Sequence, residues 1–447
     1  MLYFNGKILT DEGVKDTLFV RNGVIDSFCA PDGYEGERFD LKGRAMTSAF
    51  YDAHGHIAAF ARSLAYVSLR DATSIEEIEF LLKNAATSGG VIIGFGYDSI
   101  TPTKELLDAV SPLTPVIAAH SSGHMGVINS AAQKLFNVDK SELSEEEFML
   151  LSSKIPESDA TESAYLMDKA QQIYASNGYV LAQEGLASKS ELDFLSRSRI
   201  YLDVRTFADM RRTENGRCDG YKIILDGSPQ GKTAYLSRPY KGTNNYGHLA
   251  MSDDEVLEYM RKSRGKQLLV HANGDAAIEQ FLRCLEKVPL HRSVLIHAQL
   301  IRQEQIERAV RMGVIISFFS SHTYYWGDAH IKNLGERART ISPLRSALDA
   351  GAVCTLHQDA PVTMPNMLET LCFAVERVTR GGILLGANER VNIEQAFCCA
   401  TKNCAYQYGE EAFRGKIAAG CEANFIVLSQ SGESIDATFL RGQKIYG

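Results

Sequence analysis

The chain has 447 residues, of which 45% are hydrophobic and 23% are charged, and its formal net charge is −8. This is an ordinary globular composition, and the negative charge without any run of Lys or Arg argues against general nucleic-acid binding. No apolar run long enough to span a bilayer, no secretory leader and no Cys-x-x-Cys pair among nine cysteines is evident, so we expect a cytoplasmic protein with reduced thiols.

Both ends of the chain predict short strands separated by turns. Asn5-Gly6 and Asn22-Gly23 are hairpin-type turn signals between extended apolar runs. The predicted strands are Leu2–Phe4, Lys7–Leu9, Thr17–Val20, Val24–Phe28, Ala423–Leu428 and Ala437–Ile445. Two strand-rich ends that flank an α/β middle predict one small β-sandwich domain, built from residues 1–48 and 406–447.

The middle of the chain, residues 49–405, alternates apolar strand patterns with amphipathic helices. The candidate strands are Phe50–Ala53, Tyr179–Gln183, Tyr201–Thr206, Tyr221–Leu225, Gln267–Val270, Ser293–Ile296, Val314–Phe318 and Val353–Leu356. Eight strands with intervening helices predict an α/β fold of the (β/α)8 TIM-barrel type. A doubly wound open sheet is the alternative, although no Gly-x-Gly-x-x-Gly follows an early strand.

The interval between the first and second candidate strands is too long for a simple barrel. Roughly residues 60–170 lie there, and they contain helical patterns such as Ser74–Ala86 and strand-like pieces such as Pro115–Ala119. A connection of this length needs structure of its own. We therefore expect an inserted subdomain after strand 1, over the carboxyl-terminal mouth of the barrel.

Potential metal ligands follow several of the predicted strands. His54 and His56 lie two residues apart after the first strand, and strand ends of a barrel converge on one face, where active sites lie. The other candidates are Lys222, His271, His297 and Asp359. Imidazoles with a carboxylate suit zinc or another first-row divalent metal. Each residue alone has an ordinary alternative: a buried hydrogen-bonded histidine, an ion-paired lysine, or an aspartate that caps a helix.

The ordered set of motifs resembles the amidohydrolase superfamily, and within it the amidohydrolase-3 group of metal-dependent hydrolases. The resemblance covers nearly the whole chain. Its most specific stretches are Asp52-Ala-His-Gly-His56, Gly94-Phe-Gly-Tyr-Asp98, Gly123-His124 through Asn129-Ser130, Lys222 through Asp226-Gly-Ser228, His271-Ala-Asn-Gly-Asp275, Ile296-His-Ala-Gln299, Asp359-Ala-Pro-Val362 and Gly415-Lys-Ile-Ala-Ala-Gly420.

The resemblance implies a binuclear metal site. His54 and His56 would bind the more buried metal, and His271 and His297 the second. Lys222 would be the bridging lysine, carboxylated by carbon dioxide, between two zinc ions, with iron, manganese or nickel as alternatives. Asp359 would bind the first metal and shuttle a proton from the water that becomes a metal-bound hydroxide to the leaving group.

Further residues are expected around the substrate. His322, after the seventh strand, would act in catalysis by polarising the substrate carbonyl, and the resemblance places His124 at the pocket. Trp326 and Tyr324 would line it, and Arg238 would hold a carboxylate; packing or a surface position is the alternative for these three. His357 stands where the family usually has glycine, and we expect it to pack beneath or contact Asp359.

Together these features predict a metal-dependent hydrolase of a non-peptide carbon–nitrogen bond, amide-like, in a small molecule. One alternative is a deaminase of a cyclic amidine, although mononuclear deaminases usually lack the bridging lysine. A second is a non-catalytic, metal-binding regulatory protein of the same fold. A third alternative, a dinucleotide-dependent oxidoreductase, is disfavoured because the sequence lacks the phosphate-binding loop of that class. We expect neither a nucleic-acid nor a membrane partner, and the sequence is compatible with a homo-oligomer.

Overall fold

The computed structural model describes residues 1–98, 100–121, 123, 125–144, 146–152, 154–156, 159–213 and 217–447. The chain forms two compact units. The first contains residues 1–56, 171–359 and 365–447, and the second contains residues 57–170 and 360–364. Each unit is described by itself below.

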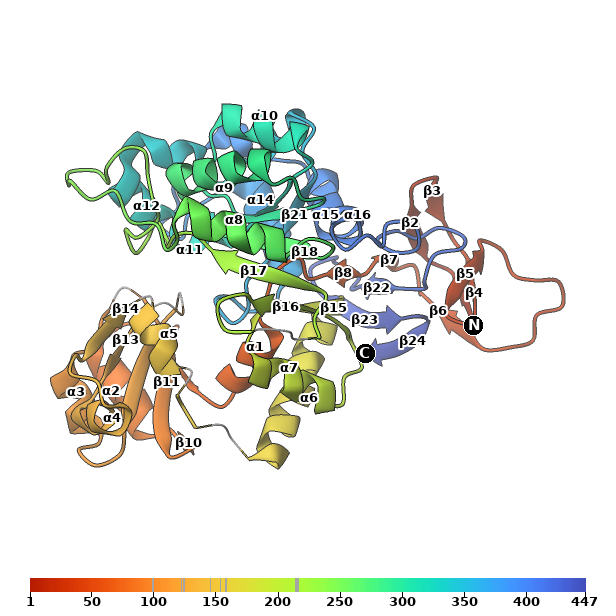
Figure 1. Ribbon diagram of the computed structural model, residues 1–447. Helices are drawn as coiled ribbons and strands as arrows, with labels where there is room; N and C mark the ends of the chain where they lie inside the picture. The colour runs from red at the N-terminus through yellow and green to blue at the C-terminus, as the bar shows by residue number, and fades with distance from the viewer. Residues whose placement is uncertain are drawn as a thin grey trace. The chain divides into compact units, whose positions relative to one another are not determined.

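The two ends of the chain come together in two sheets of the first unit. One sheet has the order β5 (Val24–Ser27), β4 (Leu18–Arg21), β1 (Leu2–Phe4), β6 (Arg38–Asp40). The other has the order β24 (Gln443–Tyr446), β23 (Ile435–Leu440), β22 (Phe425–Leu428), β7 (Ala45–Ser48), β2 (Lys7–Thr10), β3 (Gly13–Lys15). In Figure 1 the blue carboxyl-terminal strands lie beside the red amino-terminal ones, because β22 pairs antiparallel with β7. The strands predicted at both ends are confirmed, except that the run Ala437–Ile445 forms two strands, β23 and β24, divided at Arg441-Gly442. Strands β3, β6 and β7 were not predicted.

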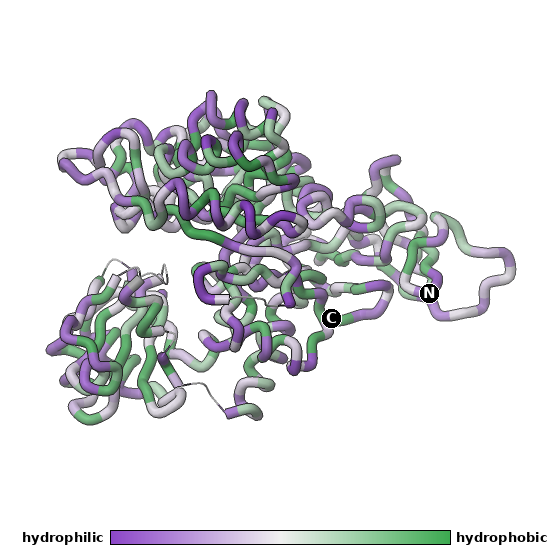
Figure 2. The backbone as a smooth tube through the Cα atoms, viewed as in Figure 1, coloured by the Kyte–Doolittle hydropathy of each residue, from purple (hydrophilic) through white to green (hydrophobic). Residues whose placement is uncertain are grey.

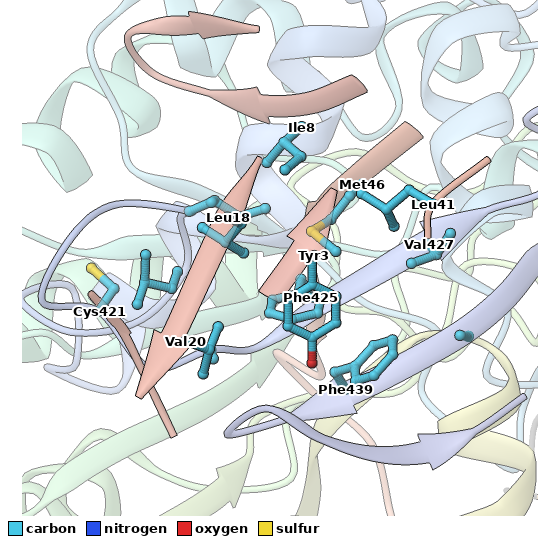
Figure 3. Close-up of a cluster of buried hydrophobic side chains, with 14 residues drawn as sticks. Tyr3, Ile8, Leu18, Val20, Leu41, Met46, Cys421, Phe425, Val427 and Phe439 are labelled. Carbon is cyan, nitrogen blue, oxygen red and sulfur yellow. The ribbon is translucent and has the colours of Figure 1, made fainter. Parts of the chain in front are cut away.

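One hydrophobic core lies between these two sheets (Figure 3). Tyr3 of β1 makes edge-to-face contacts with Phe425 of β22 and Phe439 of β23, with ring centroids 4.8 and 5.3 Å apart. The Tyr3 hydroxyl donates a hydrogen bond to the carbonyl of Gly442, so the ring is buried while its polar end is satisfied. Burial of each such side chain contributes about 1.5–3 kcal/mol, which ties the two chain ends into one domain.

A curled parallel sheet forms the centre of the first unit. Its strand order is β21 (Cys354–Leu356), β20 (Ile315–Phe318), β19 (Val294–His297), β18 (Gln267–Ala272), β17 (Gly220–Ile224), β16 (Asp203–Asp209), β15 (Tyr179–Ala187), β8 (Phe50–Tyr51). All neighbouring strands pair in parallel, which confirms the eight predicted strands and their order. Within these described strands β21 and β8 do not pair, but the amide of Asp359 donates a hydrogen bond to the carbonyl of His54 just beyond them.

Amphipathic helices connect and cover the strands of this sheet. They are α7 (Lys189–Arg197), α8 (Asp253–Lys262), α9 (Asp275–Lys287), α10 (Gln303–Arg311), α11 (Ser321–Tyr325), α12 (Gly327–Leu334), α13 (Leu344–Asp349), α14 (Met367–Glu376), α15 (Ile393–Ala400) and α16 (Lys402–Gln407), with 3-10 segments η1 (Gly335–Thr340) and η2 (Ala387–Glu389). Capping boxes start α7 and α8, among others: the side chains of Ser188 and Glu191, and those of Ser252 and Glu255, satisfy each other's backbone amides. Figure 2 shows hydrophobic residues along the strands and hydrophilic ones on the outer helices and loops.

The second unit has a sheet of its own, covered on both faces. Its elements are α1 (Ile57–Ser63), β9 (Val67–Ser68), α2 (Ile75–Lys83), β10 (Thr87–Ser88), β11 (Val91–Tyr97), α3 (Lys104–Val110), β12 (Val116–His120), β13 (Met125–Ile128), α4 (Ser130–Phe136), β14 (Glu142–Ser144) and α5 (Glu146–Ser152), and α6 (Ala160–Ser176) leads out of it. Alternate residues of β12 face opposite cores, with Ile117 on the α4–α5 side and Val116 on the α2–α3 side. Among the described residues of either unit, no helix is long and apolar enough to cross a membrane.

Candidate metal centre

Six polar side chains meet at the carboxyl-terminal ends of the central strands. His54 and His56 follow β8, and His297 is the last residue of β19. The remaining three lie on β17, on β18 and after β21; they are Lys222, His271 and Asp359. All six belong to the first unit, and only His56 among them is not buried. The sequence thus predicted residues that the fold does bring together.

Asp359 stands at the centre of this group. Its Oδ1 lies 3.3 Å from Nε2 of His56 and 3.5 Å from Nε2 of His54, and its Oδ2 lies 3.6 Å from Nε2 of His297. One donor atom from each of His54, His297 and Asp359 fits within 4.8 Å of the other two. The carboxylate therefore faces three imidazole nitrogens, two from the segment after β8 and one from β19, a spacing suited to sharing one ion.

Lys222 and His271 complete the group from the neighbouring strands. Nζ of Lys222 lies 2.6 Å from Nε2 of His54. The ring of His271 lies 4.7 Å, centroid to centroid, from that of His297. A hydrogen-bonded chain then leads away from His271 through the amides of Asn273 and Gln299 to Nε2 of His322, with donor–acceptor distances of 3.3, 2.9 and 3.4 Å. His322 is thereby connected to the group, and its ring lies 5.7 Å from that of His297.

Two of the central residues have an unusual backbone conformation. His297 has φ = 73° and Asp359 has φ = 56°, in the left-handed region that residues other than glycine seldom adopt. Each is the point at which the chain turns away from a strand end toward the group. Such backbone conformations cost about 1–3 kcal/mol and concentrate at functional sites. The left-handed conformation at these two turns therefore directs the side chains of His297 and Asp359 into the group.

Burial and mutual charge set the ionisation of the group. Burial opposes ionisation of Asp359, but the imidazoles around it, of which His56 is the one that carries positive charge, outweigh burial and hold the pKa of Asp359 well below the ordinary value. For His54, burial first and Lys222 second hold the pKa well below 6.5. Burial likewise lowers the pKa of Lys222 to about 8. The site thus combines a carboxylate with an imidazole that stays neutral.

His56 differs from the other imidazoles in its charge environment. Burial acts to lower its pKa, but the carboxylates of Asp359 and Glu184 prevail and raise it to about 9. The position of Nε2 of His56 consequently favours positive charge. A divalent cation would benefit from the same carboxylates that here hold a proton.

Each imidazole of the His-x-His pair is held by a residue in the middle of β15 (Tyr179–Ala187), which the sequence analysis did not single out. Nδ1–H of His54 donates to Oε1 of Gln183 at 2.6 Å, and Nδ1–H of His56 donates to the carboxylate of Glu184 at 3.3 Å. Both bonds leave Nε2 as the nitrogen that faces Asp359. The signal was available, because Gln183 and Glu184 are polar residues at a strand end of the predicted barrel.

His297 is held in a comparable way by a second histidine. Nε2 of His357 lies 3.1 Å from Nδ1 of His297, and Nδ1 of His357 lies 2.7 Å from Oγ of Ser317. His357 is fully buried, and burial lowers its pKa to about 3. The expected contact beneath Asp359 is therefore with the neighbouring imidazole.

The donor set fits a divalent metal ion. Oδ1 of Asp359 is buried and has no well-aligned hydrogen bond, although it lies close to two imidazoles. A buried carboxylate oxygen without such a bond calls for an explanation, and a cation is the simplest one. Neutral imidazole nitrogens and a carboxylate oxygen are ligands for zinc and similar metals.

The residues expected around the substrate are placed unequally. Trp326 packs on His322, with ring centroids 5.2 Å apart, whereas Tyr324 stacks on Phe373 of α14 at 4.4 Å. Arg238 is exposed, and its carbonyl accepts a hydrogen bond from Arg337. His124 lies outside the described residues. The structure thus brings Trp326, but neither Tyr324 nor Arg238, into contact with the histidine cluster through a described interaction.

Comparison with known proteins identifies the family. The Amidohydro_3 model of the amidohydrolase family matches residues 37–445, so the chain belongs to this family. It is 26% identical to the amidohydrolase YtcJ of Bacillus subtilis (strain 168), over 100% of this chain and 99% of that one. It is 24% identical to the N-substituted formamide deformylase of Arthrobacter pascens, over 90% and 86% of the two chains.

Solved structures agree with this assignment. An uncharacterized metal-dependent hydrolase from Pyrococcus furiosus superimposes with a TM-score of 0.78 at 25% identity, and the match covers 97% of this chain and 99% of that one. The protein is therefore a hydrolase-type member of the amidohydrolase family, and the similar solved structure is described as a metal-dependent hydrolase.

Proposed function

We propose that this protein hydrolyses a non-peptide, amide-like carbon–nitrogen bond of a small molecule with a divalent metal held at the strand ends. The observation that carries the proposal is the convergence of His54, His56 and His297 on the two oxygens of Asp359. The curled sheet is then the (β/α)8 barrel of the family, with its site at the carboxyl-terminal face. When bound, the metal supplies Lewis acidity that makes water nucleophilic near neutral pH.

Asp359 has the position and the ionisation state of the proton carrier. Asp359 is a carboxylate at neutral pH, and a carboxylate beside the attacking water can accept its proton. The same carboxyl group can then return that proton to the leaving nitrogen, which lets an amine depart as a neutral molecule. His322, held through Gln299, is placed to donate a hydrogen bond to the substrate oxygen as charge develops on it.

Lys222 is the residue proposed to carry a carboxylate added from carbon dioxide. Burial lowers the pKa of its amine to about 8, and an amine must be neutral to react with carbon dioxide. An ammonium beside two dications would be repelled, whereas a carbamate would attract them. We therefore propose two metal ions, zinc in the first instance, with His271 and His297 serving the second.

The relative named N-substituted formamide deformylase supplies the first substrate class to test. The metal-free protein would be reloaded separately with zinc, manganese, iron and nickel, and then offered N-alkyl and N-aryl formamides, other amides, lactones, esters and cyclic amidines. Release of formate or of another carboxylic acid together with an amine would support the proposal. Ammonia released only from cyclic amidines would establish the deaminase alternative.

A metal-loaded protein that is inactive on the whole panel would favour the remaining alternative, a metal-binding regulatory protein. The metal content of the same preparation separates that outcome from a protein that binds none of the four metals. No activity and no metal bound would contradict the proposed function as a whole.

A further inference from the structure

The second half of strand β15 contacts the His-x-His segment. The amide of Gly185 donates a hydrogen bond to the carbonyl of Gly55 at 2.8 Å, and His56 forms an isolated antiparallel bridge with Glu184. A Cβ on Gly185 would lie 2.4 Å from Cε1 of His54, so only glycine leaves room for the imidazole. The segment 183–185 is thus shaped to receive both rings.

The amide group of Gln183 has a fixed orientation. Its Nε2 donates to the carbonyl of Ala53 at 2.9 Å and to the hydroxyl of Tyr408 at 2.8 Å. The oxygen must therefore face the ring of His54, and an amide oxygen can only accept a hydrogen bond. Gln183 consequently selects the tautomer of His54 with the proton on Nδ1 and the lone pair on Nε2.

Glu184 acts on His56 by charge as well as by position. Its side chain is only 2% exposed, and the carboxylate lies 3.3 Å from Nδ1 of His56. A carboxylate that accepts the outer N–H of a metal-binding imidazole orients the ring and makes its other nitrogen a stronger donor. The buried negative charge also adds to that of Asp359 on the opposite side of the ring.

From this arrangement we infer that Gln183 and Glu184 are positioning residues that set the metal affinity of the site. The inference rests on the proposed metal-dependent function and adds to it two residues outside the six proposed ligands. Gln183 fixes the tautomer of one imidazole, and Glu184 fixes and polarises the other. Loss of either contact lowers the affinity for a divalent metal by about 10- to 100-fold.

The chain offers a matched control for each variant. Gln407 is a buried glutamine whose Nε2 donates to the same Ala53 carbonyl at 2.7 Å, whereas its Oε1 accepts from the hydroxyl of Thr355 rather than from an imidazole. Gln407→Met therefore matches Gln183→Met in the buried amide it removes. Glu389 is a buried carboxylate that accepts hydrogen bonds from Ser346 on α13, so Glu389→Gln matches Glu184→Gln.

The experiment measures the zinc dissociation constant of each full-length protein by competition with a chromophoric chelator. Circular dichroism of the metal-free proteins first verifies that each one is folded. We expect Gln183→Met and Glu184→Gln to bind zinc about 10- to 100-fold more weakly than the wild type. Gln407→Met and Glu389→Gln should stay within about twofold of the wild type, even where they lower the melting temperature as much.

Two results would overturn the inference, and they differ from failure of the proposed function. One is zinc binding by both Gln183→Met and Glu184→Gln within twofold of the wild type. The other is an equal loss of affinity in the matched controls, which would make the effect one of general stability. A wild-type protein that binds no zinc would instead refute the metal site itself, and the inference with it.

Discussion

His357 orients the imidazole of His297. Nε2 of His357 lies 3.1 Å from Nδ1 of His297, and Nδ1 of His357 lies 2.7 Å from the hydroxyl of Ser317. Burial lowers the pKa of His357 to about 3, so the imidazole is neutral and carries a single N–H, on either Nδ1 or Nε2. If Nδ1–H of His357 donates to Ser317, then Nε2 accepts from Nδ1–H of His297. Nε2 of His297 is left facing Asp359 with its lone pair available.

We predict that His357→Leu weakens metal binding by about 10- to 100-fold, because His297 loses the acceptor that fixes its tautomer. The variant also leaves two buried polar groups without partners, so the unfolding free energy should fall by about 1–3 kcal/mol. Equilibrium dialysis against a metal buffer and chemical denaturation measure the two effects separately.

Ser317→Ala is the control for this variant. It removes the outer hydroxyl but keeps the contact between His357 and His297, so it should cost about 1 kcal/mol of stability with a much smaller loss of metal affinity. Equal losses of metal affinity in the two variants would show that the contact between the imidazoles is not the cause.

Lys222 provides a prediction about stoichiometry. Lys222→Met keeps the length and apolar stem of the side chain but removes the amine that carbon dioxide would modify. We expect the wild type to bind two zinc ions per chain in the presence of bicarbonate, and the variant to bind one. Elemental analysis counts the metal, and ¹³C NMR after labelling with [¹³C]bicarbonate detects a carbamate only in the wild type. A variant that still binds two ions would refute the bridging role.

The outline of this fold was accessible from the sequence because each central strand is an apolar run that ends in polar residues. In β18, for example, Leu268, Leu269 and Val270 are fully buried and are followed directly by His271. A parallel sheet buried on both faces produces this pattern, and parallel strand ends converge on one side. The positions of the candidate ligands then followed from the strand order alone.

The residues that hold the imidazoles were not found, because their contacts depend on the pairing of strands distant in sequence. Glu184 and His56 are 128 positions apart, and they meet because β15 is the neighbour of β8 in the sheet. It is equally hard to predict which neighbours an aromatic side chain contacts. Trp326 contacts His322, whereas Tyr324, two residues earlier, stacks on Phe373. Tyr324 lies in the short helix α11 and Trp326 directly follows it, so the two side chains point in different directions. A helix of five residues is too short to be recognised from hydrophobic periodicity in the sequence.

Asp359→Asn should abolish most of the activity while keeping the fold. Asparagine has the same shape, but its amide cannot accept and return a proton, and we expect kcat to fall roughly 10²- to 10⁴-fold at saturating metal. Asp253→Asn is the control, since Asp253 pairs with Arg283 on the exposed side of α8 and should leave kcat unchanged within about threefold. Full activity of Asp359→Asn with metal bound would refute the proton-carrier role.

His330 on α12 makes the stability of the protein depend on pH. Its ring is completely buried, both ring nitrogens lack a hydrogen-bond partner among the described residues, and burial lowers its pKa from 6.5 to about 3. Between those two values the unfolded chain binds a proton at this residue and the folded protein does not. The unfolding free energy contributed by His330 is therefore fully present above pH 6.5 and is lost as the pH falls toward 3, at up to about 1.4 kcal/mol per pH unit.

The variant His330→Leu should flatten this acid limb. Leucine has a similar volume and no group to protonate, and replacement of an unpartnered buried imidazole should change the stability at pH 7.5 by less than about 1.5 kcal/mol. Urea denaturation of the wild type and the variant at half-unit steps from pH 7.5 to 4.5 gives the difference directly. The stability of the variant relative to the wild type should rise steadily as the pH falls below 6.5. Parallel pH profiles would show that His330 is not kept neutral by the fold.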